Sequence, residues 1–264
     1  MKLAVCGKGG VGKTFIAGTL AQQFARQGHA VIAIDADSSP NLARTLGLSV
    51  NEASRILPVA ENEDLIRLKT GTDYSGVFRL TFTVADIIAD YAVKTPGGAG
   101  LLVMGTVKAM GSGCTCPAHS VIKALMRHLV VERDEIVILD MEAGIEHLGR
   151  GTAEHVDTLL VVTDANQKSR ETAATIIRLA RSSAIRDIRI LGNRVASGRD
   201  KEILLSFAQE NTVPLAAVIS YDPVVADAGV TGEPVNQDNS RAVMELSILA
   251  GDLMNENRPI RQGD

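Results

Sequence analysis

Residues able to bind phosphate gather near the start of the chain, in Gly7-Lys8-Gly9-Gly10-Val11-Gly12-Lys13-Thr14. Glycines at this spacing let successive backbone N–H groups turn inward around phosphate oxygens, where a Cβ would intrude. Lys13 is placed to reach the β- and γ-phosphate oxygens, and the Thr14 hydroxyl to enter the coordination shell of Mg²⁺. The segment therefore predicts a nucleoside triphosphate site. A plain turn between a strand and a helix would give the Lys-Thr pair no role.

Lys8 stands just after the first glycine, where many phosphate loops have an uncharged residue. The segment from Lys8 to Thr14 resembles the deviant Walker A loop of the family that includes ParA, MinD, the nitrogenase iron protein and the arsenite-pump ATPases. In that family the extra lysine crosses a two-fold interface to touch the partner's nucleotide. The resemblance implies a homodimer that closes over ATP, because ATP then binds the closed form better than the open one. A solvated lysine at the mouth of the loop is the alternative.

Acidic residues end two of the aliphatic runs. Asp35-Ala36-Asp37 follows the run from Ala30 to Ile34, and Asp140 ends the run from Glu135, as a Walker B motif requires. Ligands of open α/β sheets bind at the carboxyl edge of the strands, which is where these acids should lie. We therefore expect Asp140 to hold Mg²⁺ through water.

A cysteine pair lies in mid-chain, at Cys114 and Cys116. In an extended segment, residues two apart point the same way, so both sulfurs can meet at one point. Two thiolates are half of a tetrahedral or planar shell, and a two-fold axis would supply four, which suits Zn²⁺ or Ni²⁺. A redox pair or two unconnected thiols are the alternatives. Cys6, in the first strand, is better read as packing.

Several motifs together look like those of the CooC-type ATPases, which mature the nickel centre of carbon monoxide dehydrogenase and have relatives that serve acetyl-CoA synthase. The resemblance is spread over most of the chain and implies an ATP hydrolase that delivers or inserts nickel, with homodimer closure coupled to metal binding. The motifs are the phosphate loop with Lys8, Asp35-Ala36-Asp37, Cys114-Thr115-Cys116, Glu142-Ala143-Gly144-Ile145-Glu146-His147 and Arg150-Gly151-Thr152.

The resemblance also implies roles for single residues. Asp37 would orient or deprotonate the attacking water, Asp140 would act on the metal side, and Gly144 would sense the γ-phosphate through its N–H. Asn193 is similar to the asparagine that reads adenine in this family, and Asp222 would close the other side of the base. Lys8 and Lys13 would complete the catalytic set, Gly9, Gly10, Val11, Gly12 and Thr14 would bind the phosphates of ATP or ADP and Mg²⁺, and Cys114 and Cys116 would bind Ni²⁺ or Zn²⁺ between subunits.

Aliphatic runs alternate with helical periods along the chain. Continuous aliphatic runs are typical of parallel strands covered on both faces, and Ile16, Leu20 and Phe24 repeat at helical spacing. This alternation predicts a single α/β P-loop domain over residues 1–264, with a doubly wound, mostly parallel, seven-stranded sheet flanked by helices. The strands are predicted at 3–6, 30–34, 101–104, 135–140, 158–163, 188–192 and 215–220, and the helices from residue 15 and at 41–46, 84–91, 118–129, 169–182, 201–211 and 240–253.

The composition is that of an ordinary globular protein, with 45% apolar residues and a formal charge of −4 over 264 residues. Because no run is rich in Lys or Arg, we expect no nucleic-acid partner. No apolar run approaches the roughly 20 residues that span a bilayer. The first strand begins almost at Met1, which leaves no room for a signal peptide. We therefore expect a cytoplasmic protein with no membrane partner.

Two other functions fit part of the sequence. A positioning ATPase of the ParA or MinD type shares the nucleotide residues but leaves the cysteine pair without a role, and residues 255–264 are too polar for a MinD-type membrane helix. An iron–sulfur carrier like the nitrogenase iron protein also holds its cluster on a dimer axis, but its ligands lie far apart in sequence. The client enzyme and the metal stay open.

Overall fold

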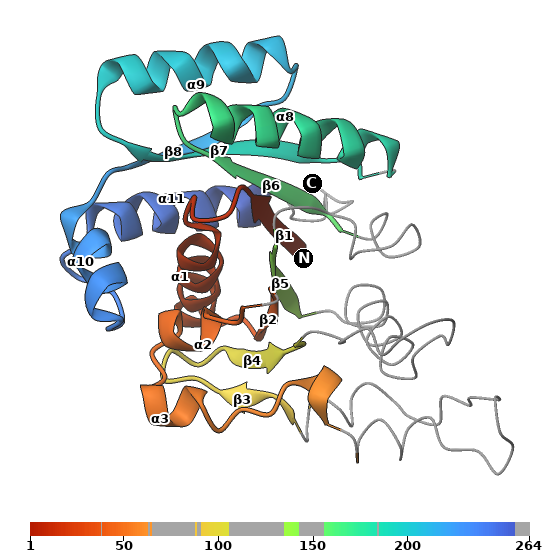
Figure 1. The fold of residues 1–264 in the computed structure, drawn as a ribbon, viewed down its shortest axis with the longest axis vertical. Helices are drawn as coiled ribbons and strands as arrows, with labels where there is room; N and C mark the ends of the chain where they lie inside the picture. Colours follow the sequence, from red (N-terminus) through yellow and green to blue (C-terminus); the bar gives the residue numbers. More distant parts are fainter. Residues whose placement is uncertain are drawn as a thin grey trace, which may run out of the picture.

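A single twisted sheet with helices on both faces forms the body of the protein (Figure 1). The computed structural model describes residues 1–37, 39–62, 64, 88, 91–105, 135–142, 156–183 and 185–256. The strands are ordered β3-β4-β2-β5-β1-β6-β7-β8, and all neighbouring pairs are parallel except β3 with β4. The predicted doubly wound, mostly parallel α/β architecture is therefore confirmed.

The sheet has eight strands, one more than predicted. The extra strand, β3, is two residues long and pairs with β4 across a turn in which the Thr95 N–H and hydroxyl both donate to the Ala99 carbonyl. So short an edge strand leaves no periodic pattern in the sequence. The strands are β1 Lys2–Gly7, β2 Val31–Ala36, β3 Val93–Lys94, β4 Gly100–Val103, β5 Ile136–Met141, β6 Thr158–Thr163, β7 Ile188–Val195 and β8 Leu215–Ser220.

The helices follow the predicted alternation, with three elements that the sequence pattern did not indicate. The helix α10 buries no side chain, so no apolar stripe marks it, and α3 and η1 are four and three residues long. The predicted helix 118–129 and most of 84–91 lie outside the described residues. The elements are α1 Lys13–Arg26, α2 Leu42–Thr45, α3 Val50–Ala53, η1 Val59–Glu61, α8 Gln167–Ser182, α9 Gly198–Glu210, α10 Pro223–Thr231 and α11 Arg241–Glu256.

Both faces of the sheet are covered by aliphatic side chains. On one face, Leu3 and Val5 of β1 pack with residues of α1 and α11; on the other, Ala4 and Cys6 pack with residues of α8 and α9. Cys6 is thus a core residue, as the packing interpretation predicted. Each fully buried aliphatic side chain contributes about 1.5–3 kcal/mol. No helix in the described part of the chain is long and apolar enough to cross a membrane.

The short helix α2 rests directly on α1. A Cβ at Gly18 of α1 would lie only 2.5 Å from Thr45 Cγ2, so the glycine sets how closely the two helices approach. The Gln22 amide donates to the Thr45 carbonyl oxygen at 3.3 Å, and Leu42, the first residue of α2, is fully buried. The segment that follows β2 is therefore held against the helix that follows the phosphate loop.

We expect Gly18→Ala to lower the free energy of unfolding by about 1–3 kcal/mol, because the new methyl group must push α2 away from α1. Gly251→Ala is the matched control. Gly251 lies in α11, where a Cβ would meet no atom within 4 Å. That change should stabilise the protein by about 0.5–1 kcal/mol through helix propensity. Urea unfolding of both variants measures the difference, and equal effects would contradict the proposed contact.

Candidate nucleotide-binding site

The phosphate loop joins β1 to α1 at the carboxyl edge of the sheet. Gly7 has φ 151° and passes so close to β6 that a Cβ there would lie 2.3 Å from the Val162 carbonyl oxygen. Gly12, at φ 101°, begins α1 in the left-handed conformation. A Cβ at Gly9, in contrast, would meet no atom within 4 Å. The glycines shape a backbone cradle whose centre is open, as a bound phosphate requires.

Positive charge is concentrated at the start of α1. Gly12 is the N-cap, no side chain caps the helix, and its first turn has no acidic residue. The first N–H groups and the positive end of the helix dipole can therefore meet an anion. Lys13 is only 6% exposed, and its ammonium nitrogen lies 3.5 Å from the Lys8 carbonyl oxygen. A buried cation beside an uncapped helix terminus fits a phosphate group.

Asp140 has a fully buried carboxylate near the end of β5. Neither of its oxygens has a hydrogen-bond partner within the described residues. Burial raises the pKa of Asp140 to about 7; the nearby Thr14 hydroxyl opposes this rise without reaching standard hydrogen-bond geometry, and the charge of Asp35 adds to it. An ionised carboxylate without a partner is costly in such a place. This site is therefore suited to a positively charged ligand.

A magnesium ion fits these residues. Mg²⁺ takes oxygen ligands and keeps several waters, so the Thr14 hydroxyl would bind it directly and Asp140 would hold one of its waters. The ion would also offset the cost of ionising Asp140. Within the described ranges, no three His, Cys, Asp or Glu side chains converge as a metal site, so the fit to Mg²⁺ rests on Asp140 and Thr14.

Asp37 is the first residue after β2 and lies at the same edge of the sheet as Asp140. Its backbone N–H donates to Asp35 Oδ1 at 3.2 Å, and its own Oδ1 accepts the Ser39 N–H at 2.9 Å. In the parallel register of β2 and β5, Asp35 lies opposite Asp140. The fold thus brings the predicted water-orienting acid, the predicted magnesium acid and the phosphate loop to one edge. The sequence interpretation gave Asp35 no role of its own, although the Asp-x-Asp pattern was the available signal.

Asn193 lies behind the phosphate loop. Its amide nitrogen donates to the Val11 carbonyl oxygen at 2.8 Å, and a Cβ at Gly12 would lie 2.3 Å from that nitrogen. The next residue, Arg194, has φ 56° at an irregularity in the pairing of β7 with β8. Asn193 therefore supports the loop from β7, a contact that spacing along the chain could not show. Its contact with adenine stays a prediction.

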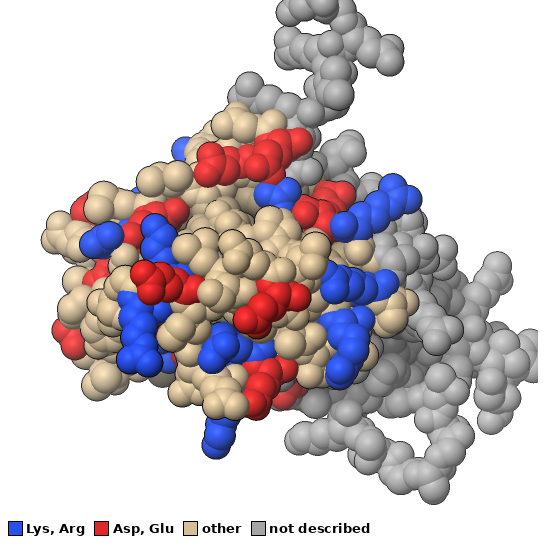
Figure 2. Space-filling model, turned by 90° about the horizontal axis from the view of Figure 1, so that it is seen from above, with Lys and Arg blue, Asp and Glu red and all other residues tan. Residues whose placement is uncertain are grey.

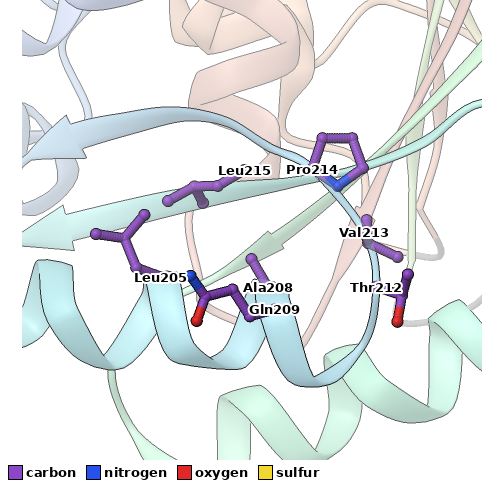
Figure 3. A pocket seen from close by; sticks show the side chains of 7 residues that line it. All are labelled: Leu205, Ala208, Gln209, Thr212, Val213, Pro214 and Leu215. Atoms are coloured by element: carbon purple, nitrogen blue, oxygen red, sulfur yellow. The ribbon is translucent and has the colours of Figure 1, made fainter.

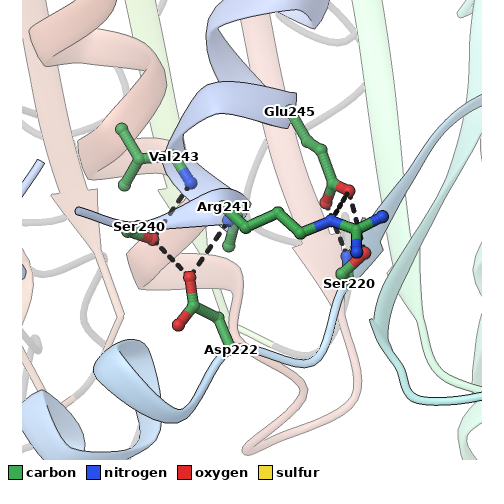
Figure 4. Close-up of polar contacts among 7 residues, drawn as sticks. Ser220, Asp222, Ser240, Arg241, Val243 and Glu245 are labelled. Carbon is green, nitrogen blue, oxygen red and sulfur yellow. Dashed lines mark hydrogen bonds and ion pairs between the residues drawn. The ribbon is translucent and has the colours of Figure 1, made fainter. Parts of the chain in front are cut away.

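Asp222 is the N-cap of α10 and lies at the centre of a polar cluster (Figure 4). One carboxylate oxygen accepts the Val224 N–H, and the other accepts the Ser240 hydroxyl at 2.7 Å and the Ala242 N–H at 3.1 Å. Burial is the largest single influence on the pKa of Asp222 and raises it. The hydrogen bonds from Ser240, Ala242 and Val224 act in the opposite direction, and together they lower the pKa below its ordinary value. The carboxylate thus joins α10 to the start of α11. Its predicted place beside the base stays a prediction.

Three predicted site residues, Cys114, Cys116 and Gly144, lie outside the described residues. The structure does show an open apolar hollow between α9 and β8, lined by Leu205, Ala208, Gln209, Thr212, Val213, Pro214 and Leu215 (Figure 3). This hollow lies where β8 begins, whereas the phosphate loop follows the end of β1. In a parallel sheet these are opposite edges, so the hollow is no part of the nucleotide site.

Charged residues of both signs are interspersed on the face seen from above, where the described Lys and Arg side chains alternate with Asp and Glu (Figure 2). A nucleic-acid surface is instead marked by a continuous basic patch. The expected absence of a nucleic-acid partner stays a prediction.

The fold and the phosphate site together define a nucleotide-binding protein, and comparison with known families agrees. The profile of the CobQ/CobB/MinD/ParA nucleotide binding domain matches residues 3–235. This range includes the phosphate loop and both strand-terminal acids. The chain belongs to this family.

Two relatives are similar to this chain over nearly its whole length. The carbon monoxide dehydrogenase accessory protein CooC of Rhodospirillum rubrum is 40% identical over 252 residues, which cover 92% of this chain and 95% of the relative. An uncharacterised ATP-binding protein of Methanocaldococcus jannaschii is 40% identical over 250 residues, covering 93% and 95%. The resemblance to CooC-type ATPases is therefore confirmed.

Solved structures show the same fold. The MinC:MinD cell division protein complex of Aquifex aeolicus has a chain with a TM-score of 0.70 and 21% identity, covering 98% of both chains. A ParA family ATPase of Chlorobium tepidum TLS has a TM-score of 0.69 and 18% identity, covering 96% of this chain and 98% of the other. At such identities the similarity concerns the fold alone.

Removing the charge of Asp140 should change how stability depends on pH. Because burial raises the pKa of Asp140 from 3.8 to about 7, the folded chain holds a proton in this window that the unfolded chain releases. The free energy of unfolding of the metal-free protein should therefore fall as the pH rises from about 4 to 7. Asp140→Asn, which is neutral throughout, should lack this fall.

Denaturant unfolding with a chelator present, at about pH 5 and about pH 8, measures the effect. The advantage of Asp140→Asn over the wild type should grow by about 1 kcal/mol or more between these two conditions, since one pKa unit corresponds to about 1.4 kcal/mol. An advantage that does not change with pH would show that Asp140 ionises as readily in the folded as in the unfolded chain.

Proposed function

We propose that this protein is an ATP-dependent accessory protein that delivers or inserts nickel into a carbon monoxide dehydrogenase or acetyl-CoA synthase. The observation that carries the proposal is the 40% identity to the carbon monoxide dehydrogenase accessory protein CooC over 92% of the chain. The site supports it, because Lys13 is buried beside an uncapped helix terminus, and the Asp140 carboxylate, which lies near Thr14, accepts no hydrogen bond from the described residues. These are the groups that a magnesium-bound nucleotide would need.

In this proposal the protein hydrolyses ATP to ADP and phosphate. The loop N–H groups, the start of α1 and Lys13 bind the β- and γ-phosphates, and bound Mg²⁺ supplies charge neutralisation there. Asp37 takes a proton from the attacking water as the water oxygen bonds to the γ-phosphorus. The bond to the β–γ bridging oxygen breaks, and ADP keeps that electron pair. The Gly144 N–H contacts the γ-phosphate, while Asn193 and Asp222 flank the base.

Lys8 links the nucleotide to a homodimer. Its carbonyl oxygen accepts the Val11 N–H at 3.2 Å and lies 3.5 Å from the Lys13 ammonium nitrogen, so its backbone is fixed in the phosphate loop. A lysine fixed there can reach across a two-fold axis to the nucleotide of the second copy. ATP would then favour the closed dimer because it gains the Lys8 contact only in that state.

Nickel would bind where two copies meet. Cys114 and Cys116 from each copy give four thiolates, a set that suits planar Ni²⁺ or tetrahedral Zn²⁺. Closure over ATP changes the spacing of these sulfurs, and hydrolysis relaxes it. Because such coupling is reciprocal, bound metal also shifts nucleotide affinity. Here nickel is the cargo of the protein rather than a permanent cofactor.

The other two functions remain alternatives. The MinD and ParA structures share the fold at 21% and 18% identity, which gives no reason to prefer a positioning ATPase over the CooC function. An iron–sulfur carrier would be brown when purified without oxygen, whereas a nickel or zinc protein with thiolate ligands would lack that absorption. The colour of the protein purified without oxygen therefore distinguishes an iron–sulfur carrier from a protein that carries nickel or zinc.

ATP should convert the monomer to a homodimer, and Lys8→Ala should abolish this response. Analytical ultracentrifugation with Mg²⁺ and either ADP or a non-hydrolysable ATP analogue measures it. Lys201→Ala is the control, because Lys201 is an exposed lysine of α9 that makes no part of the site. A wild-type protein whose mass is the same with both nucleotides would refute nucleotide-driven closure.

ATP should also change the affinity for Ni²⁺ by about fivefold or more, as expected for a typical coupling free energy. Equilibrium dialysis with and without the analogue measures the affinity, and metal analysis should give one ion per dimer. Cys114→Ala and Cys116→Ala should each lose this ion, whereas Cys6→Ala should keep it because Cys6 lies in the core. Nickel retained by the variant that combines Cys114→Ala with Cys116→Ala would place the nickel site elsewhere in the protein.

A further inference from the structure

Asp35 is a buried acid whose carboxylate joins two separated points of the chain. The side chain is fully buried near the end of β2. Its Oδ1 accepts the Asp37 N–H at 3.2 Å, and its Oδ2 accepts the Leu42 N–H at 2.9 Å. Both oxygens are thus engaged by backbone donors. The carboxylate ties the start of the segment that leaves β2 to the first residue of α2.

The far end of this connection is itself fixed to the phosphate site. Leu42 is fully buried, Thr45 accepts the Gln22 amide, and Gly18 lets α2 lie directly on α1. The same helix α1 begins with Lys13 and Thr14. A continuous series of contacts therefore runs from the phosphate loop through α1 and α2 to Asp35, and from Asp35 to the backbone of Asp37.

Burying the Asp35 carboxylate carries a desolvation cost. Burial raises the pKa of Asp35, and the N–H groups of Leu42 and Asp37 oppose that rise. The rest of β2 that enters the sheet, from Val31 to Ile34, is aliphatic. An aliphatic side chain at position 35 would avoid the desolvation cost but would leave both N–H groups without this acceptor. The carboxylate is the side chain that meets both donors at once.

We propose that Asp35 is a positioning residue for hydrolysis: it holds the backbone of Asp37 in register with α2 and the phosphate loop. The inference rests on the proposed function, because it assumes that Asp37 acts on the attacking water. Asp35 touches neither substrate nor metal in this account. It acts on the rate by fixing where the Asp37 carboxylate stands, and a displacement of about 1 Å at a reacting group can cost on the order of a hundredfold in rate.

Asp35→Asn is the sharpest variant, because it keeps the shape but offers one acceptor oxygen instead of two. The amide NH₂ then faces one of the backbone N–H donors, so the hydrogen bond to either Asp37 or Leu42 is lost. We expect kcat for ATP to fall at least tenfold, while the ADP dissociation constant changes less than twofold. A side chain that only supported the fold would instead lower thermal stability and affect both quantities.

The matched control is Asp200→Asn, which makes the same chemical change at another carboxylate that accepts two backbone N–H groups. Asp200 Oδ2 accepts from Ala196 and Ser197 at the start of α9. Its kcat should equal that of the wild type. If Asp35→Asn is unfolded at the assay temperature, Asp35→Ser is measured in its place, because a hydroxyl also leaves a single acceptor oxygen; the same fall in kcat with unchanged ADP binding is expected.

The wild type and Asp37→Asn complete the experiment. Loss of hydrolysis in Asp37→Asn, together with the selective fall in Asp35→Asn, supports the inference, and the double variant should be no slower than Asp37→Asn within about twofold. If Asp37→Asn is inactive but Asp35→Asn keeps the wild-type kcat, the inference fails and the proposed function stands. If the wild type hydrolyses no ATP, or Asp37→Asn is as active as the wild type, the proposed function itself fails.

Discussion

The site depends on the parallel register of three neighbouring strands. In that register Asp35 of β2 lies opposite Asp140 of β5, and Asp140 lies opposite Val5 of β1, two residues before the phosphate loop begins at Gly7. Parallel strands end at the same edge, so two acids and an anion-binding loop converge although they lie far apart in sequence. The packing on both faces holds this register, because slipping a strand by one residue would exchange the side chains that fit the two cores.

The convergence of two buried carboxylates makes it costly to ionise both, and a bound cation would offset that cost. Burial raises the pKa of both Asp35 and Asp140, and the two charges reinforce each other at Asp140. The structure relieves the two acids differently. Asp35 receives two backbone N–H groups, whereas Asp140 receives no hydrogen bond from the described residues. One acid is thereby committed to the fold, and the other keeps its oxygens for a cation and its waters.

Much of this arrangement follows from the sequence, because long aliphatic runs and glycine spacing report backbone requirements directly. The seven longer strands, the phosphate loop and the edge where the acids gather were predictable on that basis. The strand β3 and the helix α10 were not, since a two-residue strand and a helix without a buried side chain leave no apolar pattern. The contacts of Asn193 with Val11 and of Asp35 with Leu42 were equally hidden, because they depend on how distant elements pack rather than on residue spacing.

These packing contacts make α2 a junction between the segment that carries Asp37 and the helix α10. The Leu42 N–H at the start of α2 donates to Asp35, and α2 packs against α1 at Gly18. The Arg44 guanidinium of α2 donates to the carbonyl oxygen of Gly232, the C-cap of α10. At its other end, α10 is capped by Asp222, whose carboxylate also accepts hydrogen bonds from the Ser240 hydroxyl and from the Ala242 N–H at the start of α11. The segment that carries Asp37 is therefore connected by hydrogen bonds to the helix that follows Asp222.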